Sequence, residues 1–156
     1  EHALYFAAQG LTVTGIDFLD QPIAQARAKA AQRGVSVAFR VKDALSLQLW
    51  PERFDNVLDS GLFHIFSDDD RAVYVKGLAT VLKPGGRLYL LCFSDRTPGK
   101  QGPRRVPLAE LESAFGAAWL LESIEPATFE CRPEFRDTLF GGVDPQGWFV
   151  IAQRAP

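Results

Sequence analysis

The stretch LTVTGIDFLDQPIAQARAKAAQRGVSVAFRV, residues 11–41, decides the fold of this chain. Residues 11–17 alternate apolar residues or glycine with threonine, and this pattern predicts a strand. Asp20 and Pro22 indicate the start of a helix by capping and by proline in its first turn. Residues 35–41 predict a second strand. A strand, a helix and a strand in succession indicate a parallel β-α-β unit.

The same alternation continues through the middle of the chain. Residues 54–58 (FDNVL) and 87–93 (RLYLLCF) predict two further strands. Between them, Ser67 is the expected N-terminal cap of a helix that Pro84-Gly85-Gly86 ends. The continuous apolar character of residues 87–93 is typical of a strand that is buried on both faces near the centre of a sheet.

The C-terminal third follows a different pattern. A helix is expected over residues 108–115, and strands over 119–129 and 147–153 with no helix between them, which predicts an antiparallel pair. Residues 97–107, rich in glycine, proline and basic residues, predict a loop long enough to be functional. With a short helix over residues 1–9, the fold class is α/β: a Rossmann-like, mainly parallel sheet with helices on both faces and an antiparallel C-terminal strand pair.

Composition restricts the class of protein. Of the 156 residues 47% are apolar and 23% charged, which predicts one folded domain over residues 1–156. The net charge of -2 gives no basic excess for nucleic acid or an anionic membrane. The longest apolar run, residues 88–93, is well short of the roughly 18 residues that a membrane helix needs. Cys92 and Cys131 have no ligand-like spacing, which predicts neither metal nor disulfide and favours a reducing, cytoplasmic location.

Acidic residues follow three of the predicted strands. Asp17 ends the first strand, Asp43 comes two residues after the second, and Asp59 directly follows the third. In open α/β sheets ligands bind at the carboxyl ends of the strands. The sequence therefore predicts a ligand site at this edge of the sheet.

Four short stretches carry a resemblance to a known family. They are VTGIDF (13–18), VKDA (41–44), FDNVLDS (54–60) and LKPGGRL (82–88). In this order and spacing the chain resembles class I S-adenosylmethionine-dependent methyltransferases of the small-molecule type, related to the thiopurine and tellurite methyltransferase-like group. The resemblance covers nearly the whole chain. It implies in-line methyl transfer from S-adenosyl-L-methionine to a small-molecule acceptor.

The resemblance also assigns cofactor-binding residues. Asp17 would accept hydrogen bonds from the two ribose hydroxyls, and Phe18 would flank the adenosine. Asp43 would accept the adenine amino group while the N–H of Ala44 donates to the ring. Ser60 would line the methionyl part and the transferable methyl group. The alternative for each aspartate is a turn or capping role, and Asp59 could equally be a structural acceptor of backbone N–H groups.

The sequence defines the residues that would contact the methyl acceptor less clearly. His64 is the candidate for acid–base catalysis, since imidazole titrates near neutral pH; a packed loop histidine is the alternative. Methyl transfer from a sulfonium does not strictly require a base, because alignment of the reacting atoms supplies much of the acceleration. Phe63 would contact the cofactor or the substrate. Arg104 and Arg105 could hold an anionic group of the acceptor, and solvated side chains are the alternative.

One part of the family pattern is missing from the sequence. The Gly-rich loop that binds the methionine part, and the strand before it, would precede Glu1. In the resembled topology that strand lies between the strands at 11–17 and 54–58, so two apolar edges would be unpaired. We therefore expect a longer biological chain, or closure of the gap by direct strand pairing or by exchange with another chain, with weak cofactor binding.

Two other functions remain open from the sequence. An Asp after the second strand of a Rossmann fold also binds the ribose of NAD, which fits a nucleotide-dependent oxidoreductase. The third possibility is a folded fragment without turnover. The sequence does not decide the oligomeric state, and a homodimer is left open.

Overall fold

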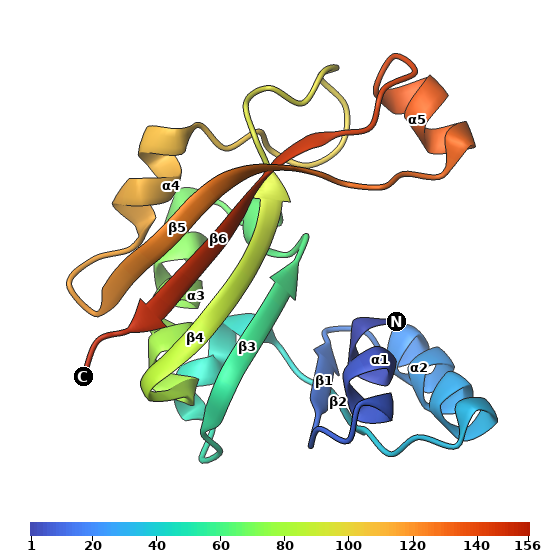
Figure 1. Cartoon of the computed structure of the whole chain (residues 1–156), viewed down its shortest axis with the longest axis vertical. Helices are drawn as coiled ribbons and strands as arrows, with labels where there is room; N and C mark the ends of the chain where they lie inside the picture. The colour runs from blue at the N-terminus through green and yellow to red at the C-terminus, as the bar shows by residue number, and fades with distance from the viewer. The chain divides into compact units, whose positions relative to one another are not determined.

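The computed structural model describes residues 1–156, which form two compact units, residues 1–47 and 48–156 (Figure 1). Each unit contains one β-sheet. The first unit has a two-stranded sheet of order β1-β2, and the second has a four-stranded sheet of order β3-β4-β6-β5. None of the helices is long and apolar enough to span a membrane.

The first unit is the predicted β-α-β element with one helix before it. β1 (Thr14–Asp17) and β2 (Ala38–Val41) pair in parallel, and α2 (Asp20–Arg33) connects them. The preceding helix α1 spans His2–Ala8. The buried side chains of this unit are Leu4, Ile23, Ala30, Ala44 and Leu47.

Local signals explain the ends of α2. Gly34 follows the helix in the left-handed conformation, with φ 63°, which glycine adopts without a Cβ penalty. The predicted capping by Asp20 is wrong by one position: Leu19 is the N-cap, and Asp20 is the first helical residue. Asp20 still lies where a negative charge is favourable, beside the positive end of the helix dipole. Both strands are shorter than predicted, because pairing begins at Thr14 and Ala38.

The second unit contains the antiparallel pair that the sequence predicts. β3 (Phe54–Ser60) is parallel to β4 (Leu82–Phe93). β6 (Gln146–Arg154) is antiparallel both to β4 and to β5 (Trp119–Thr128). β4 is therefore an interior strand, as expected from its apolar sequence.

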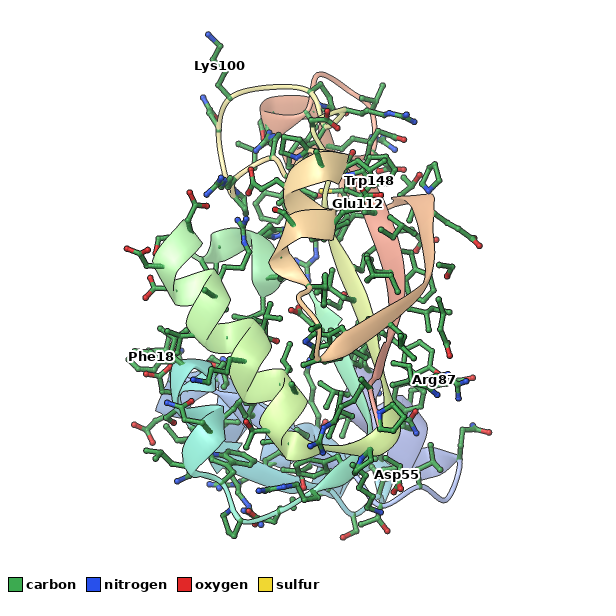
Figure 2. The ribbon with its side chains drawn as sticks, turned by 90° about the vertical axis from the view of Figure 1, so that its left-hand side faces the viewer. Phe18, Asp55, Arg87, Lys100, Glu112 and Trp148 are labelled. Carbon is green, nitrogen blue, oxygen red and sulfur yellow. The ribbon has the colours of Figure 1, made fainter.

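Helices cover one face of this sheet (Figure 2). They are α3 (Asp68–Val81) and α4 (Leu108–Ala114), and beneath them Leu88, Leu90 and Cys92 of β4 have no exposed surface. Tyr89 and Leu91 alternate with these residues and are only half-buried. The strand expected to be buried on both faces is thus fully buried on the face under the helices and half-buried on the other.

The region around α3 differs in detail from the prediction. Ser67 caps the helix as expected, since its Oγ accepts the N–H of Asp70 at 3.2 Å. The helix ends at Val81, before Pro84, and residues 83–86 form an irregularity in β4 opposite Asp55. Gly86 is required there because a Cβ would lie 2.8 Å from the carbonyl oxygen of Asp55.

Three short helices were not predicted. They are the 3-10 helices η1 (Ala44–Leu49) and η2 (Phe63–Ile65) and the α-helix α5 (Pro133–Leu139). η1 and η2 begin within three residues of the carboxyl ends of β2 and β3, where the sequence predicts ligand binding.

The strands predicted at residues 11–17 and 54–58 are not part of one continuous sheet. β1 and β3 belong to different sheets, and each has one edge without a strand partner.

Candidate functional site

Two aspartates mark the carboxyl ends of β1 and β2. Asp17 is the last residue of β1, and its carbonyl accepts the N–H of Lys42, immediately before Asp43. One carboxylate oxygen of each aspartate stabilises its own turn. Asp17 Oδ1 accepts the N–H of Leu19 at 2.9 Å, and Asp43 Oδ1 accepts the N–H of Leu45 at 2.8 Å. Each carboxylate thus has a second oxygen available for a ligand.

The neighbours of these aspartates differ in exposure. Phe18 is 70% exposed, which is unusual for an aromatic side chain and leaves its ring free to contact a ligand. Ala44 is buried and is the first residue of η1, so its N–H has no acceptor within that helix. These four predicted cofactor residues lie together at one end of the first unit.

In the second unit, Asp59 is a buried structural acceptor at the end of β3. Its carboxylate accepts the N–H groups of Leu62 (2.8 Å) and Phe63 (3.0 Å) and the hydroxyl of Tyr74 on α3 (3.0 Å). Burial raises the pKa of Asp59 to about 6, although these hydrogen bonds favour the charged form. Burial and the neighbouring carboxylate raise the pKa of Tyr74 well above its ordinary value. This pair fixes the turn that contains the exposed Ser60 and the half-buried Gly61.

His64 is a buried, neutral imidazole. Only 3% of its surface is exposed, and its Nδ1 accepts the N–H of Phe93, at the end of β4, at 2.7 Å. Because Nδ1 is an acceptor in this contact, the ring proton is on Nε2. Burial, and after it the positive charges of Arg105 and Arg71, lower the pKa of His64 to about 4. These contacts favour the packed histidine over the general base.

Aromatic rings surround His64. Its centroid lies 4.4 Å from that of Phe93 and 6.0 Å from that of Phe129, and Phe93 also contacts Phe140 edge-on at 5.7 Å. β4, the loop after β5 and the segment after α5 contribute these three phenylalanines. They form an aromatic cluster at the end of the sheet to which β4 points (Figure 1).

The structure places Phe63 in the core. It has no exposed surface and stacks on Phe115 with ring centroids 6.2 Å apart, while the Arg71 guanidinium lies 4.7 Å from its ring centroid. In this arrangement Phe63 does not line an open site. Its backbone N–H, bonded to Asp59, connects it to the turn after β3.

Arg104 belongs to a closed ring of four charges. It pairs with Asp68 at 2.5 Å and with Glu110 at 2.7 Å, and Arg71 also pairs with both acids. The two positive and two negative charges connect the start of α3, the loop at 97–107 and the first turn of α4. Arg104 therefore stabilises the loop and has no unpaired charge for a substrate anion.

Arg105 uses all five of its N–H groups within its own loop. Nε donates to Thr97, Nη1 to Gln101 and Pro103, and Nη2 to Pro98 and Gly99, always to the backbone carbonyl. Its guanidinium also lies over the rings of Phe93 (5.6 Å) and Phe140 (5.9 Å). Arg105 thus holds the loop against the aromatic cluster.

Sequence reasoning missed the partners in these contacts. Tyr74, Phe93 and Glu110 were assigned no role, although each bonds a residue that was predicted to be functional. Tyr74 and Phe93 are 15 and 29 positions from their partners. No local pattern marks such contacts.

Comparisons with known proteins identify the class. The family model described as "Methyltransferase domain" matches residues 1–86. A 2-heptyl-1-hydroxyquinolin-4(1H)-one methyltransferase of Mycobacteroides abscessus is 30% identical over 167 residues, covering 97% of this chain and 74% of the relative.

Solved structures agree. One, from work on the conversion of a disulfide bond into a thioacetal group during echinomycin biosynthesis, has a TM-score of 0.86 at 32% identity, covering 99% of this chain and 71% of that one. The Burkholderia thailandensis 1,6-didemethyltoxoflavin-N1-methyltransferase, with bound S-adenosylhomocysteine, shares the fold at 24% identity and a TM-score of 0.73, covering 97% and 65%.

This chain therefore belongs to the methyltransferase-domain family, with the Rossmann-like fold of S-adenosylmethionine-dependent enzymes. Its reaction is S-adenosylmethionine-dependent methyl transfer, and S-adenosylmethionine is its cofactor. The similarities select this class over the oxidoreductase that the sequence left open.

Proposed function

We propose that residues 1–156 act as one methyltransferase domain, which binds the adenosine of the cofactor through Asp17, Phe18, Asp43 and Ala44 and methylates a small molecule. The observation that carries this assignment is the pair of aspartates at the ends of two adjacent parallel strands. Each has one carboxylate oxygen bonded to its own turn, and the second is available.

The chemistry of these residues fits an adenosine. A carboxylate accepts two hydroxyl groups of a ribose in a fork, which suits Asp17. Adenine offers an amino donor and ring-nitrogen acceptors, which match the Asp43 carboxylate and the N–H of Ala44. The exposed ring of Phe18 supplies an apolar surface for the base or the ribose. Ser60, exposed at the end of β3, would contact the methionyl part.

When bound, S-adenosylmethionine supplies an electrophilic methyl group on a sulfonium that leaves as a neutral thioether. Residues of the second unit would align the acceptor. Asp59 and Tyr74 fix the turn at Ser60 and Gly61, so the binding surface is formed before the acceptor arrives. Because Nδ1 of His64 is already bonded to Phe93, we assign no proton abstraction to it.

Arg104, Arg105 and Phe63 would act indirectly on the acceptor. The two arginines hold the loop at 97–107 against the aromatic cluster, and Phe63 supports the turn after β3. The aromatic surroundings of His64 favour an apolar acceptor with a planar ring. The relative named for a quinolone with a heptyl chain is consistent with such an acceptor.

Calorimetric titration of the chain with S-adenosylhomocysteine, in parallel with NADH, tests the cofactor assignment. We expect binding of the former only. Asp17→Asn should weaken it about 10- to 100-fold, as for the loss of hydrogen bonds to a charged group. Asp20→Asn, an exposed acid on α2, is the matched control and should leave the affinity unchanged. Binding of NADH alone would overturn the proposal, and binding of neither would favour the non-catalytic fragment.

A further inference from the structure

A role of His64 in binding the methyl acceptor, which rests on the proposed function, follows from its two ring nitrogens. His64 is almost fully buried, and its Nδ1 is bonded to the Phe93 N–H, so the ring presents an N–H at Nε2. Nε2 has no hydrogen-bond partner within the chain. Unlike the unpaired Nε of Arg71, which is fully buried, it is still accessible from outside. A buried imidazole with one fixed nitrogen and one open N–H is suited to bind a ligand atom.

Gly61 leaves space beside that N–H. It lies in the turn after β3 with φ 95°, and a Cβ built on it would lie 3.8 Å from Nε2 and 4.0 Å from the ring of Phe129. The space next to the Gly61 backbone is therefore bordered by an N–H donor and an aromatic ring. It lies at the carboxyl end of parallel strands, where α/β folds bind their ligands.

Charged groups near His64 favour an anion at Nε2. Arg105 in the loop at 97–107 and Arg71 on α3 both disfavour the imidazolium. Arg105 is bonded to backbone carbonyls rather than to a carboxylate, so its positive charge would stabilise a negative oxygen beside the imidazole N–H. The acidic groups of this region are already engaged. The Asp59 carboxylate accepts from three donors, and Asp68 and Glu110 pair with Arg71 and Arg104.

We propose that the Nε2–H of His64 binds the oxygen of the methyl acceptor, and that the acceptor is a planar apolar molecule whose oxygen is ionised near neutral pH. This oxygen attacks the methyl group. An O–C bond forms, the C–S bond breaks, and its electron pair stays on sulfur. The acceptor has already released its proton to water, so no base is needed and His64 remains neutral throughout.

Two amide substitutions at position 64 distinguish the roles of the two ring nitrogens. Asn places an oxygen near the position of Nδ1 and keeps an acceptor for the Phe93 N–H, but it has no donor at the ε position. Gln places an N–H near the position of Nε2 and loses the δ acceptor. His64→Asn should therefore keep the fold and lose acceptor binding, whereas His64→Gln should be less stable but bind the acceptor.

The probe is 2-heptyl-1-hydroxyquinolin-4(1H)-one, titrated into protein saturated with S-adenosylhomocysteine. We expect His64→Asn to weaken its binding about 10- to 100-fold and His64→Gln to weaken it by less than about threefold. His2→Gln, at the exposed histidine of α1, is the control. In nitrogen-15 spectra the Nε2–H signal of His64 should shift when the probe binds, and the signals of His2 should not.

Each contrary result has a distinct meaning. Wild-type affinity in His64→Asn would show that the histidine is only structural. Equal loss of turnover in both variants with unchanged probe binding would show that His64 is a base, since neither amide accepts a proton at neutral pH. Binding of S-adenosylhomocysteine without the probe would overturn the assigned acceptor class alone, and failure of S-adenosylhomocysteine to bind would overturn the proposed function.

Discussion

Arg105 should control the order of the loop that lies over the aromatic cluster. Replacing it by lysine keeps the positive charge but leaves three donors in place of five, without the planar geometry that reaches five carbonyls. Two of the lost contacts, to Pro98 and Gln101, are 2.9 Å long. The stacking over Phe93 and Phe140 is also weakened.

The magnitude follows from these contacts. Hydrogen bonds contribute about 1 kcal/mol each, and a partly exposed cation over aromatic rings about 0.5–1 kcal/mol. Water replaces part of the lost bonding because the loop is largely exposed. We therefore expect Arg105→Lys to lower the free energy of local opening by about 1.5–3 kcal/mol, which corresponds to a 10- to 100-fold larger open population.

Limited trypsin digestion measures this opening directly. Lys100 lies in the loop and points away from the rest of the molecule (Figure 2). Cleavage after Lys100 should accelerate by the same 10- to 100-fold when cleavage is slow relative to reclosing. Arg132→Lys, an exposed position before α5 that is followed by proline, is the control. Cleavage of Arg105→Lys at the wild-type rate would show that the five hydrogen bonds do not order the loop.

Two further predictions concern buried charge. Between about pH 4 and 6, the raised pKa of Asp59 makes the free energy of unfolding fall as the pH rises, because the native state binds more protons there than the unfolded state. The lowered pKa of His64 has the opposite effect, because its imidazole is protonated only in the unfolded state over this range. Relative to wild type, urea denaturation of His64→Asn should therefore show stability falling by about 2–3 kcal/mol over this range, and Asp59→Asn should show the opposite slope; parallel curves would contradict the assignment. In the four-charge ring, Glu110→Gln should cost about 3 kcal/mol, because it leaves Arg71 buried with only Asp68 at 3.8 Å. Arg71→Met should cost less, about 1–2 kcal/mol, because Arg104 still neutralises Glu110, and the reverse order in urea denaturation would disprove the ring.

The sequence predicts elements that depend on local signals. The bounds of α2 follow from Asp20, Pro22 and Gly34, and the start of α3 follows from the cap at Ser67. α5 has Pro133 at its first position, but its seven residues are too few to show a helical period. η2 depends on the Asp59 carboxylate, which the sequence offers as a structural acceptor of backbone N–H groups, and on the bond between His64 and Phe93, which no neighbouring residue indicates.

The candidate site likewise contains residues whose positions follow from local sequence and residues whose roles depend on distant parts of the chain. Asp17 and Asp43 act through their own turns and the strand ends before them, so their position was predictable from the chain order. The roles of Arg104 and Arg105 were not, because an arginine pair in a loop has the same sequence whether it is free or fully bonded. Their partners come from α3, α4 and the loop itself, and only the folded chain brings these segments together.

These contacts indicate how the second unit contributes to methyl transfer. Tyr74 and two backbone N–H groups hold Asp59, and Phe93 holds His64, so the turn with Ser60 and Gly61 is fixed from α3 on one side and from β4 on the other. Burial lowers the pKa of His64 to about 4, which makes it a weak base at neutral pH, and the Asp59 carboxylate already accepts hydrogen bonds from three donors. A sulfonium methyl group needs an aligned nucleophile more than it needs a base. In the proposed function, the buried polar groups of this unit are therefore fixed supports that position the acceptor.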